Sequence, residues 1–356
     1  MPATVNAPGP ASPLRVAVAG ATGLVGQRFV ALLAAHPWFD LEVLTASERS
    51  AGRRYGDVVD WRLAEPLPPA IAALTVQPNA AAARCRLVFS ALDAAVAGEV
   101  ERELAAAGAF VVSNAKNFRM HPQVPLVVPE VNPEHLGLLE QQQFGGGAIV
   151  TNPNCSTIGL VLALQPLAAA FGVRAVHVVT LQALSGAGIG GPSALAMLDN
   201  LIPHIGGEEE KIEQETRKIL GRLENGAVRD ADIRVSAQCN RVAVLDGHTE
   251  CVSVELGREV AAAELVAAWR GFRSLPQELG LPSAPRAPIH YRDEIDAPQP
   301  RLHRDLERGM ATVIGRLQPC AVLHHRFVAL SHNTIRGAAG GSILLAELAV
   351  ARGRVG

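Results

Sequence analysis

The sequence predicts an α/β protein with two domains, a doubly wound parallel sheet followed by an α+β domain with an open mixed sheet. A short apolar run near the N-terminus ends in a glycine-rich turn, and short apolar segments then alternate with helical ones as far as Asn154. Beyond Asn154 the apolar segments are longer and alternate in polarity. Short buried runs are typical of parallel strands, and alternating runs are typical of sheets with one open face. The chain therefore changes architecture near Asn154.

The first domain begins with a strand, a helix and a second strand in direct succession. We expect the strand at Leu14–Ala19, the helix at Gly23–Ala35 and the second strand at Leu41–Thr45, which together form a βαβ unit. Four more apolar segments continue the alternation of the doubly wound sheet. These further strands are expected at Leu87–Ala91, Phe110–Val112, Val124–Pro129 and Ala148–Thr151.

The second domain begins with a helix at Thr157–Phe171 and a long strand at Ala175–Leu184, followed by the glycine-rich loop Ser185–Gly191. The Pro-rich stretch Leu281–Pro300 predicts a surface excursion. The last helix, Ile343–Ala351, is expected to return to the first domain. Further expected elements are the strands Ile233–Leu245 and Thr249–Leu256 and the helix Glu259–Phe272. The expected boundaries are a tail at 1–13, a first domain at 14–154 completed by 333–356, and a second domain at 155–332.

Length, charge and apolar content exclude several classes of protein. The 356 residues exceed the size of most single cores, and 49% hydrophobic with 19% charged residues is a globular composition. The net charge of -2, without a basic run, predicts neither a nucleic-acid nor a membrane-surface partner. No apolar stretch is long enough to span a bilayer. The uncharged tail 1–13 lacks the features of a secretory signal and is expected to be disordered.

The five cysteines are odd in number and form no CxxC pair. This pattern favours a reducing, cytoplasmic location over a disulfide scaffold, and it predicts no metal site. Most cysteines in such proteins are small buried hydrophobic residues. We expect that role for the four that lie in or beside apolar strand patterns: Cys85, Cys239, Cys251 and Cys320.

The turn Gly20–Gly26 lies between the first strand and the first helix. Glycines there allow a tight turn, and the amides at the helix start suit a pyrophosphate, so the turn indicates a Rossmann-type dinucleotide site. Ser47, Arg49 and Ser50 follow the second strand and suit a 2′-phosphate, which favours NADP. The alternative is that the Glu48 carboxylate faces a free ribose hydroxyl, as in NAD enzymes.

Cys155 differs from the other cysteines because it lies in NPNCST, where a strand gives way to a helix. Amides at a helix start stabilise a thiolate, so we expect a lowered pKa and a nucleophilic sulfur. Such a thiolate requires a proton shuttle. His248 follows a tight Asp246-Gly247 turn between two expected strands, where it can line a cleft, although an exposed turn histidine is the alternative.

Several segments resemble the aspartate-semialdehyde dehydrogenase family, in particular its archaeal and fungal branch. The most specific are NPNCSTIG (152–159) and SAQCNRVAVLDGHTE (236–250). Together the matching segments extend over nearly the whole chain. The others are GATGLVGQRF (20–29), SERSAGRRYGD (47–57), SNAKNFRM (113–120), TLQALSGAG (180–188), IGGEEEKIEQET (205–216) and SHNTIRGAAGGS (331–342).

The resemblance implies a role for each matching residue. Cys155 corresponds to the nucleophile, His248 to the general acid/base, and Gln182 to the residue that orients the imidazole and the thioacyl oxygen. Arg241 is expected to bind the substrate α-carboxylate and Glu208 its α-ammonium group, with Glu209 or Glu210 as alternatives. The expected phosphate site is Lys211, Arg119 and Asn154. The expected cofactor contacts are Gly20, Thr22, Gly23, Leu24 and Val25 at the phosphates, Ser47, Arg49 and Ser50 at the 2′-phosphate, and Ser90, Ser185, Gly186 and Asn333 at the ribose and nicotinamide.

The activity implied by the resemblance is NADPH-dependent reduction of L-aspartyl-4-phosphate to L-aspartate 4-semialdehyde and phosphate, in lysine, methionine and threonine biosynthesis. The implied assembly is a homodimer or homotetramer. An alternative on the same fold is a malonyl- or succinyl-CoA reductase, which needs no phosphate clamp. N-acetyl-glutamyl-phosphate reductase is a more distant alternative, because its acylated amine would leave Glu208 without a cation. A non-catalytic NADP sensor is a third.

Overall fold

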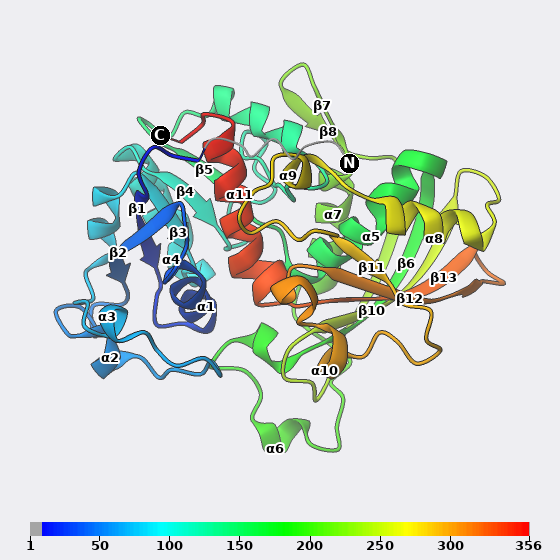
Figure 1. The fold of residues 1–356 in the computed structure, drawn as a ribbon, viewed down its shortest axis with the longest axis horizontal. Coiled ribbons are helices and arrows are strands. Elements are labelled where there is room, and N and C mark those ends of the chain that lie inside the picture. The colour runs from blue at the N-terminus through cyan, green and yellow to red at the C-terminus, as the bar shows by residue number, and fades with distance from the viewer. Residues whose placement is uncertain (1–8, 356) are drawn as a thin grey trace.

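The computed structural model describes residues 9–355 and contains two large sheets that lie side by side (Figure 1). One sheet has five strands in the order β2-β1-β3-β4-β5, and the other has six in the order β11-β12-β13-β10-β6-β9. The expected combination of a doubly wound domain and a domain with a mixed sheet is confirmed. Of the expected tail, residues 1–8 lie outside the described residues.

The five-stranded sheet is parallel throughout. After β2 the chain crosses back over β1 to continue with β3, so the winding direction reverses beside β1. Ligands bind at such a reversal, at the carboxyl ends of the strands. The strands are β1 (Leu14–Ala19), β2 (Phe39–Thr45), β3 (Leu87–Ser90), β4 (Phe110–Ser113) and β5 (Ala148–Thr151). The helices of this part are α1 (Leu24–Leu33), α2 (Tyr55–Val58), α3 (Pro69–Ala72) and α4 (Ala94–Ala106), with 3-10 turns at Asn79–Arg84 and Pro133–Gln141.

The C-terminal helix α11 (Gly340–Ala351) returns to the first sheet, as expected. Figure 1 shows it in red between the two halves of the molecule. Apart from Ser342 and Glu347 it is apolar, and it is almost entirely buried, which is typical of a helix enclosed by protein. Ile343 and Leu344 share a core with Phe29 and Phe89 of the parallel sheet and its helix. A π-helical turn, Ile335–Ala339, precedes α11.

The six-stranded sheet is covered on one face by α5 (Cys155–Phe171) and α8 (Ala262–Gly271), whose Leu160, Leu164 and Trp269 share a core with the strands. Its other face carries exposed side chains such as His177 and Arg326. The strands are β6 (Val173–Gln182), β9 (Arg234–Arg241), β10 (His248–Leu256), β11 (Ile289–Tyr291), β12 (Thr312–Pro319) and β13 (His325–Ser331).

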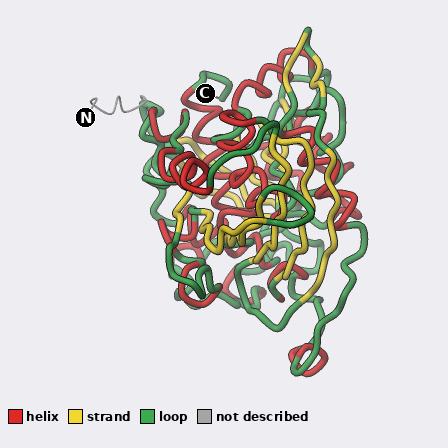
Figure 2. The backbone as a smooth tube through the Cα atoms, turned by 90° about the vertical axis from the view of Figure 1, so that its right-hand side faces the viewer, coloured by secondary structure: helices red, strands yellow, loops and turns green. Residues whose placement is uncertain are grey.

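The remaining elements are short, apart from α7 (Glu208–Ile219), which lies against β9 and α5. Figures 1 and 2 show α6 (Ala194–Met197) on a loop that projects from the body. Across residues 9–355 no helix combines the length and apolar character needed to cross a membrane. The other elements are α9 (Leu275–Glu278), α10 (Pro300–His303), the hairpin β7 (Arg222–Glu224) with β8 (Ala227–Arg229), and 3-10 turns at Leu184–Ala187 and Leu306–Gly309.

One strand prediction and one loop prediction are wrong. Val124–Pro129 forms only one bridge, between Leu126 and Thr151, because the prolines at 125 and 129 have no N–H to extend a ladder. The Pro-rich stretch expected to be a pure surface excursion contributes β11, which pairs in parallel with β12.

Two further expectations need correction. β9 and β10 are not neighbours across a tight turn: β6 lies between them, so residues 242–247 cross the end of β6. His248 is therefore the first residue of β10 and lies beside the end of β6. Cys251 was expected to be buried but is exposed on the open face of the sheet, and Cys320 is only half-buried.

Candidate active site

A cavity of about 1290 Å³ extends from the glycine turn after β1 to the start of α7. Its walls come from both domains, and most of the predicted site residues line it. These are Gly20, Thr22, Gly23, Leu24, Val25, Ser47, Arg119, Asn154, Cys155, Gln182, Ser185, Gly186, Glu208, Lys211, Arg241 and Asn333. Four predicted residues do not line it: Arg49, Ser50, Ser90 and His248.

The glycine turn has the geometry of an anion site. Gly20 has a φ of 78°, and a Cβ there would lie 2.6 Å from the Ala91 carbonyl oxygen. Only glycine suits both the backbone conformation and this close approach. Gly23 caps α1 without a side-chain hydrogen bond, so the first amides of the helix remain available to a phosphate. The residues present therefore fit the pyrophosphate of a dinucleotide.

The turn after β2 contains the residues that would distinguish NADP from NAD. Ser47 and Glu48 line the cavity, whereas Arg49 and Ser50 lie next to them but off its wall. Ser90 does not fit the expected contact. It is fully buried and donates a 2.6 Å hydrogen bond to Glu101, beneath the cavity.

The nucleophile candidate lies at the start of α5. Asn154 caps this helix by accepting hydrogen bonds from the backbone N–H groups of Ser156 (2.9 Å) and Thr157 (3.3 Å). The adjacent Cys155 Sγ is 3.2 Å from His248 Nε2. The sulfur therefore lies between the capped start of α5 and the imidazole of His248.

The imidazole is oriented by a backbone group. The Ala183 N–H donates to His248 Nδ1 at 3.0 Å. Because an N–H can only donate, Nδ1 is the unprotonated nitrogen, and the proton of the neutral ring is on Nε2, facing the sulfur. Gln182 was expected to orient this ring, but its amide instead donates to Thr180 and to Glu208 (3.3 Å).

Two glycines allow the close approach of neighbouring segments to this pair. A Cβ at Gly186 would lie 3.0 Å from the His248 ring and 2.9 Å from Arg241 Nη1. A Cβ at Gly337, in the π-helical turn, would lie 2.7 Å from the Cβ of Cys155. Any larger side chain at either position would displace the pair. π-helical turns are frequent at functional sites.

Contrary to expectation, the pKa of Cys155 is raised. Burial raises the pKa of the thiol to about 12, with a further contribution from the Glu208 carboxylate. The charges of Arg119 and Arg241 and the hydrogen bond from Ser156 lower this pKa only in part. Burial also lowers the pKa of His248 to about 3, and the charge of Arg241 acts in the same direction. Desolvation thus outweighs the helix start. The pair rests as a neutral thiol and a neutral imidazole.

These shifts predict the pH dependence of Cys155 alkylation. The reactive thiolate fraction increases as the pH approaches the thiol pKa, so the rate of iodoacetamide labelling should increase up to pH 9 without reaching a plateau. Peptide mass spectrometry of the labelled Cys155 separates it from the exposed Cys251. A plateau near pH 7 would instead indicate a thiolate stabilised by the helix start.

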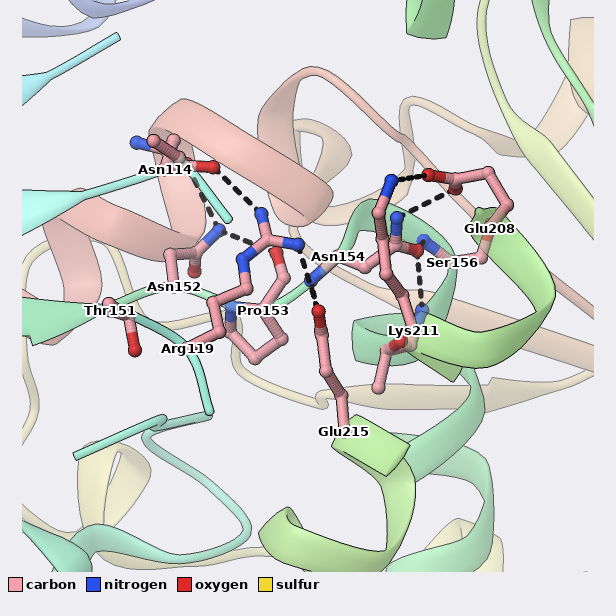
Figure 3. Close-up of polar contacts among 12 residues, drawn as sticks. Asn114, Arg119, Thr151, Asn152, Pro153, Asn154, Ser156, Glu208, Lys211 and Glu215 are labelled. Carbon is pink, nitrogen blue, oxygen red and sulfur yellow. Dashed lines mark hydrogen bonds and ion pairs between the residues drawn. The ribbon is translucent and has the colours of Figure 1, made fainter. Parts of the chain in front are cut away.

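The charged side chains form a compact group at the other end of the cavity (Figure 3). Glu208 accepts hydrogen bonds from Lys211 Nζ (2.6 Å) and Asn154 Nδ2 (2.7 Å). Burial raises the pKa of Glu208, but these donors outweigh burial and the net shift is downward. Of its two alternatives, Glu209 accepts from a backbone N–H of β9 and Glu210 is exposed. Glu208 is therefore the acid of this run that faces the cavity.

Two arginines complete the group. Arg241 is 5% exposed, and its Nη1 donates to the Ala183 carbonyl at 2.7 Å. Arg119 is 7% exposed and pairs with Glu215 at 3.0 Å. Within residues 9–355, no group of three or more His, Cys, Asp and Glu side chains is arranged to hold a metal.

Known proteins share this organisation. Residues 15–139 match the family described as semialdehyde dehydrogenase, NAD binding domain, and residues 164–336 match its dimerisation domain. The aspartate-semialdehyde dehydrogenase of Methanothermobacter thermautotrophicus is 51% identical over 342 residues, which cover 94% of this chain and 98% of that protein. That of Cryptococcus neoformans is 48% identical over 362 residues, covering 97% and 99%. The chain belongs to the aspartate-semialdehyde dehydrogenase family.

A solved structure of the family agrees in fold. The Candida albicans aspartate-semialdehyde dehydrogenase, described as a complex with NADP, matches with a TM-score of 0.88 and 44% identity, covering 96% of this chain and 99% of that one. The matched dimerisation domain supports self-association of this family member.

The sequence did not predict three features of this active site: the Ala183 N–H that orients His248, the close approach of Gly337 to Cys155, and the contacts of Glu215. A backbone donor leaves no signal in the sequence. Gly337 lies in a glycine-rich segment whose close approach to Cys155 is set by tertiary packing. Glu215 had a signal, because Glu208, Lys211, Glu215 and Lys218 recur every three or four residues and so share one face of α7.

Proposed function

We propose that this chain catalyses the reversible, NADPH-dependent reduction of L-aspartyl-4-phosphate to L-aspartate 4-semialdehyde and phosphate. The observation that carries the proposal is the 3.2 Å contact between the Sγ of Cys155, which lines the cavity, and the Nε2 of His248. An anion-binding turn lies on one side of this pair, and a group of charged residues lies on the other. The names of the full-length relatives support the same activity.

In the oxidative direction, Cys155 Sγ forms a bond to the aldehyde carbon. The thiol proton leaves to solvent, and His248 Nε2 donates the proton that it carries at rest to the aldehyde oxygen. NADP, when bound, supplies the hydride acceptor. His248 takes the hydroxyl proton as the carbon is oxidised, which leaves an acyl group in thioester linkage to Cys155. A phosphate oxygen then attacks this carbon and the C–S bond breaks. The leaving sulfur takes up the proton that the phosphate loses, which restores the thiol. Two steps replace one difficult displacement.

The charges of the cavity match those of the substrate. Arg241 is the proposed partner of the α-carboxylate, since a guanidinium fork suits a planar anion. Glu208 is the proposed partner of the α-ammonium group. Arg119 and Lys211, with Asn154, form the proposed phosphate site. Holding all three charged groups orients the reacting carbon towards the sulfur.

NADP is the proposed cofactor. The complex of the Candida albicans relative with NADP supports this assignment, as does the fit of the glycine turn to a pyrophosphate. Ser47 lines the cavity, and the guanidinium of the adjacent Arg49 is exposed and long enough to turn towards a 2′-phosphate. Glu48 is the residue that would instead favour NAD.

Assembly, location and pathway complete the proposal. We propose a homodimer or homotetramer, a cytoplasmic location, and a place in lysine, methionine and threonine biosynthesis. Division into a cofactor domain (14–154 with 333–356) and a catalytic domain (155–332) is also proposed. The relatives named above give no support to a malonyl- or succinyl-CoA reductase. Arg119 and Lys211 line the same cavity as Cys155, and two cations there favour a phosphate substrate. Intact Cys155 and His248 argue against a non-catalytic sensor.

A direct assay tests this function. The enzyme is mixed with aspartate semialdehyde and NADP, and NADPH formation is followed with and without phosphate. We expect phosphate-dependent turnover, with NADP used better than NAD. Turnover with malonyl- or succinyl-CoA and none with aspartate semialdehyde would replace this proposal by the acyl-CoA alternative.

A further inference from the structure

Glu215 is a buried carboxylate on α7 that joins two parts of the site without lining the cavity. It is 2% exposed and is absent from the cavity walls. One oxygen accepts from Arg119 Nη1 at 3.0 Å, and the other accepts from the backbone N–H of Asn154 at 2.6 Å (Figure 3). Arg119 belongs to the proposed phosphate site, and Asn154 immediately precedes the nucleophile.

We propose that Glu215 is a positioning residue that fixes the guanidinium of Arg119 relative to the start of the helix that carries Cys155. This inference rests on the proposed function, because it takes phosphate to be the ligand of Arg119. Glu215 acts through Arg119 and does not itself contact the substrate.

The contacts of Arg119 show why its orientation depends on Glu215. Nη2 donates to the Asn114 carbonyl at 2.7 Å, and Nη1 donates to Glu215. Nε is buried and has no hydrogen-bond partner. A guanidinium is planar and rigid, so two bonds on one side determine where the remaining N–H groups point. Without Glu215, one of the two bonds is lost and the plane is free to turn about the other.

α7 also holds the backbone that carries Arg119. Lys218, one turn beyond Glu215, donates to the carbonyls of Arg119 (2.6 Å), His121 (3.0 Å) and Val124 (3.2 Å). We therefore expect the main chain to stay in place when Glu215 is changed. An effect of that change is thus expected at the guanidinium, and not as unfolding of the segment.

A Glu215→Gln substitution separates the two contacts. The glutamine oxygen still accepts from the Asn154 N–H, but its NH2 group then faces Arg119 Nη1, donor against donor. We expect the phosphate KM to increase about tenfold or more, while kcat and the KM for aspartate semialdehyde change less than about threefold. Glu213→Gln is the matched control, because Glu213 lies on the same helix and bonds only a backbone N–H of β9. The control should match the wild type.

A double-mutant cycle tests whether Glu215 acts through Arg119. In an Arg119→Leu background, Glu215→Gln should add less than about twofold to the phosphate KM, because the guanidinium that it orients is absent. Stabilisation by inorganic phosphate, measured as a shift in Tm, gives a second readout that needs no turnover. Glu215→Gln should reduce this shift relative to Glu213→Gln.

The inference is overturned if Glu215→Gln leaves both phosphate readouts at wild-type values, or if its effect on the phosphate KM is unchanged in the Arg119→Leu background. Failure of the proposed function has a different signature, which is wild-type enzyme that oxidises aspartate semialdehyde without any dependence on phosphate.

Discussion

Replacing Cys155 by alanine should reduce kcat by roughly 10⁴-fold or more, because no other group in the cavity can form the thioacyl bond. The fold should persist. The helix cap comes from the side chain of Asn154, and alanine keeps the Cβ against which Gly337 packs. Steady-state turnover measures the loss, and circular dichroism with NADP binding measures the fold.

A serine at this position should retain only a trace of activity, because an alcohol ionises much less readily than a thiol. Cys320→Ser serves as the control, since Cys320 is half-buried at the end of β12, away from the cavity. Alanine-variant turnover within tenfold of the wild type would rule out covalent catalysis by Cys155.

The second large effect is expected at Arg241. Arg241→Leu should lower kcat/KM for aspartate semialdehyde by roughly two to three decades, because the substrate carboxylate loses a buried charged partner. The phosphate KM should change less than about threefold. Arg241→Lys keeps the charge but loses the fork, so it should recover only part of the activity.

Substitutions at the proposed phosphate site should show the opposite pattern. Arg119→Leu and Lys211→Met are expected to raise the phosphate KM most, with smaller effects on the KM for the aldehyde. If Arg241→Leu raised the phosphate KM and left the aldehyde KM unchanged, Arg241 would bind phosphate. The proposed roles of Arg241 and of Arg119 with Lys211 would then have to be exchanged.

Much of the fold was predictable because local sequence and tertiary context agree. The glycine turn, the strands of the parallel sheet and the final helix all have strong local patterns. The prediction of a strand at Val124–Pro129 is wrong because its apolar residues suggest a strand, while its prolines prevent a ladder of hydrogen bonds. The sequence predicts His248 in a tight turn between two strands, which suggests a hairpin. The sequence does not reveal that β6 lies between these two strands.

The site was predictable in its reactive residues and less so in their environment. The Cys155 motif indicated a helix start, but the sign of the pKa shift depends on how deeply the sulfur is buried, which is a tertiary property. Ser90 matched a cofactor position by its place at a strand end, yet its hydroxyl turns inward to Glu101. Glu215 lay in a run of glutamates and lysines typical of a solvated helix.

The most direct test of the central claim is a rapid-mixing experiment in phosphate-free buffer. Enzyme mixed with NADP and aspartate semialdehyde should produce a burst of NADPH equal to the concentration of Cys155, followed by little further turnover until phosphate is added. This result is expected because hydride transfer leaves an acyl group on the sulfur that phosphate must remove. Continuous NADPH formation without a burst and without phosphate would contradict a thioacyl enzyme that is discharged by phosphate.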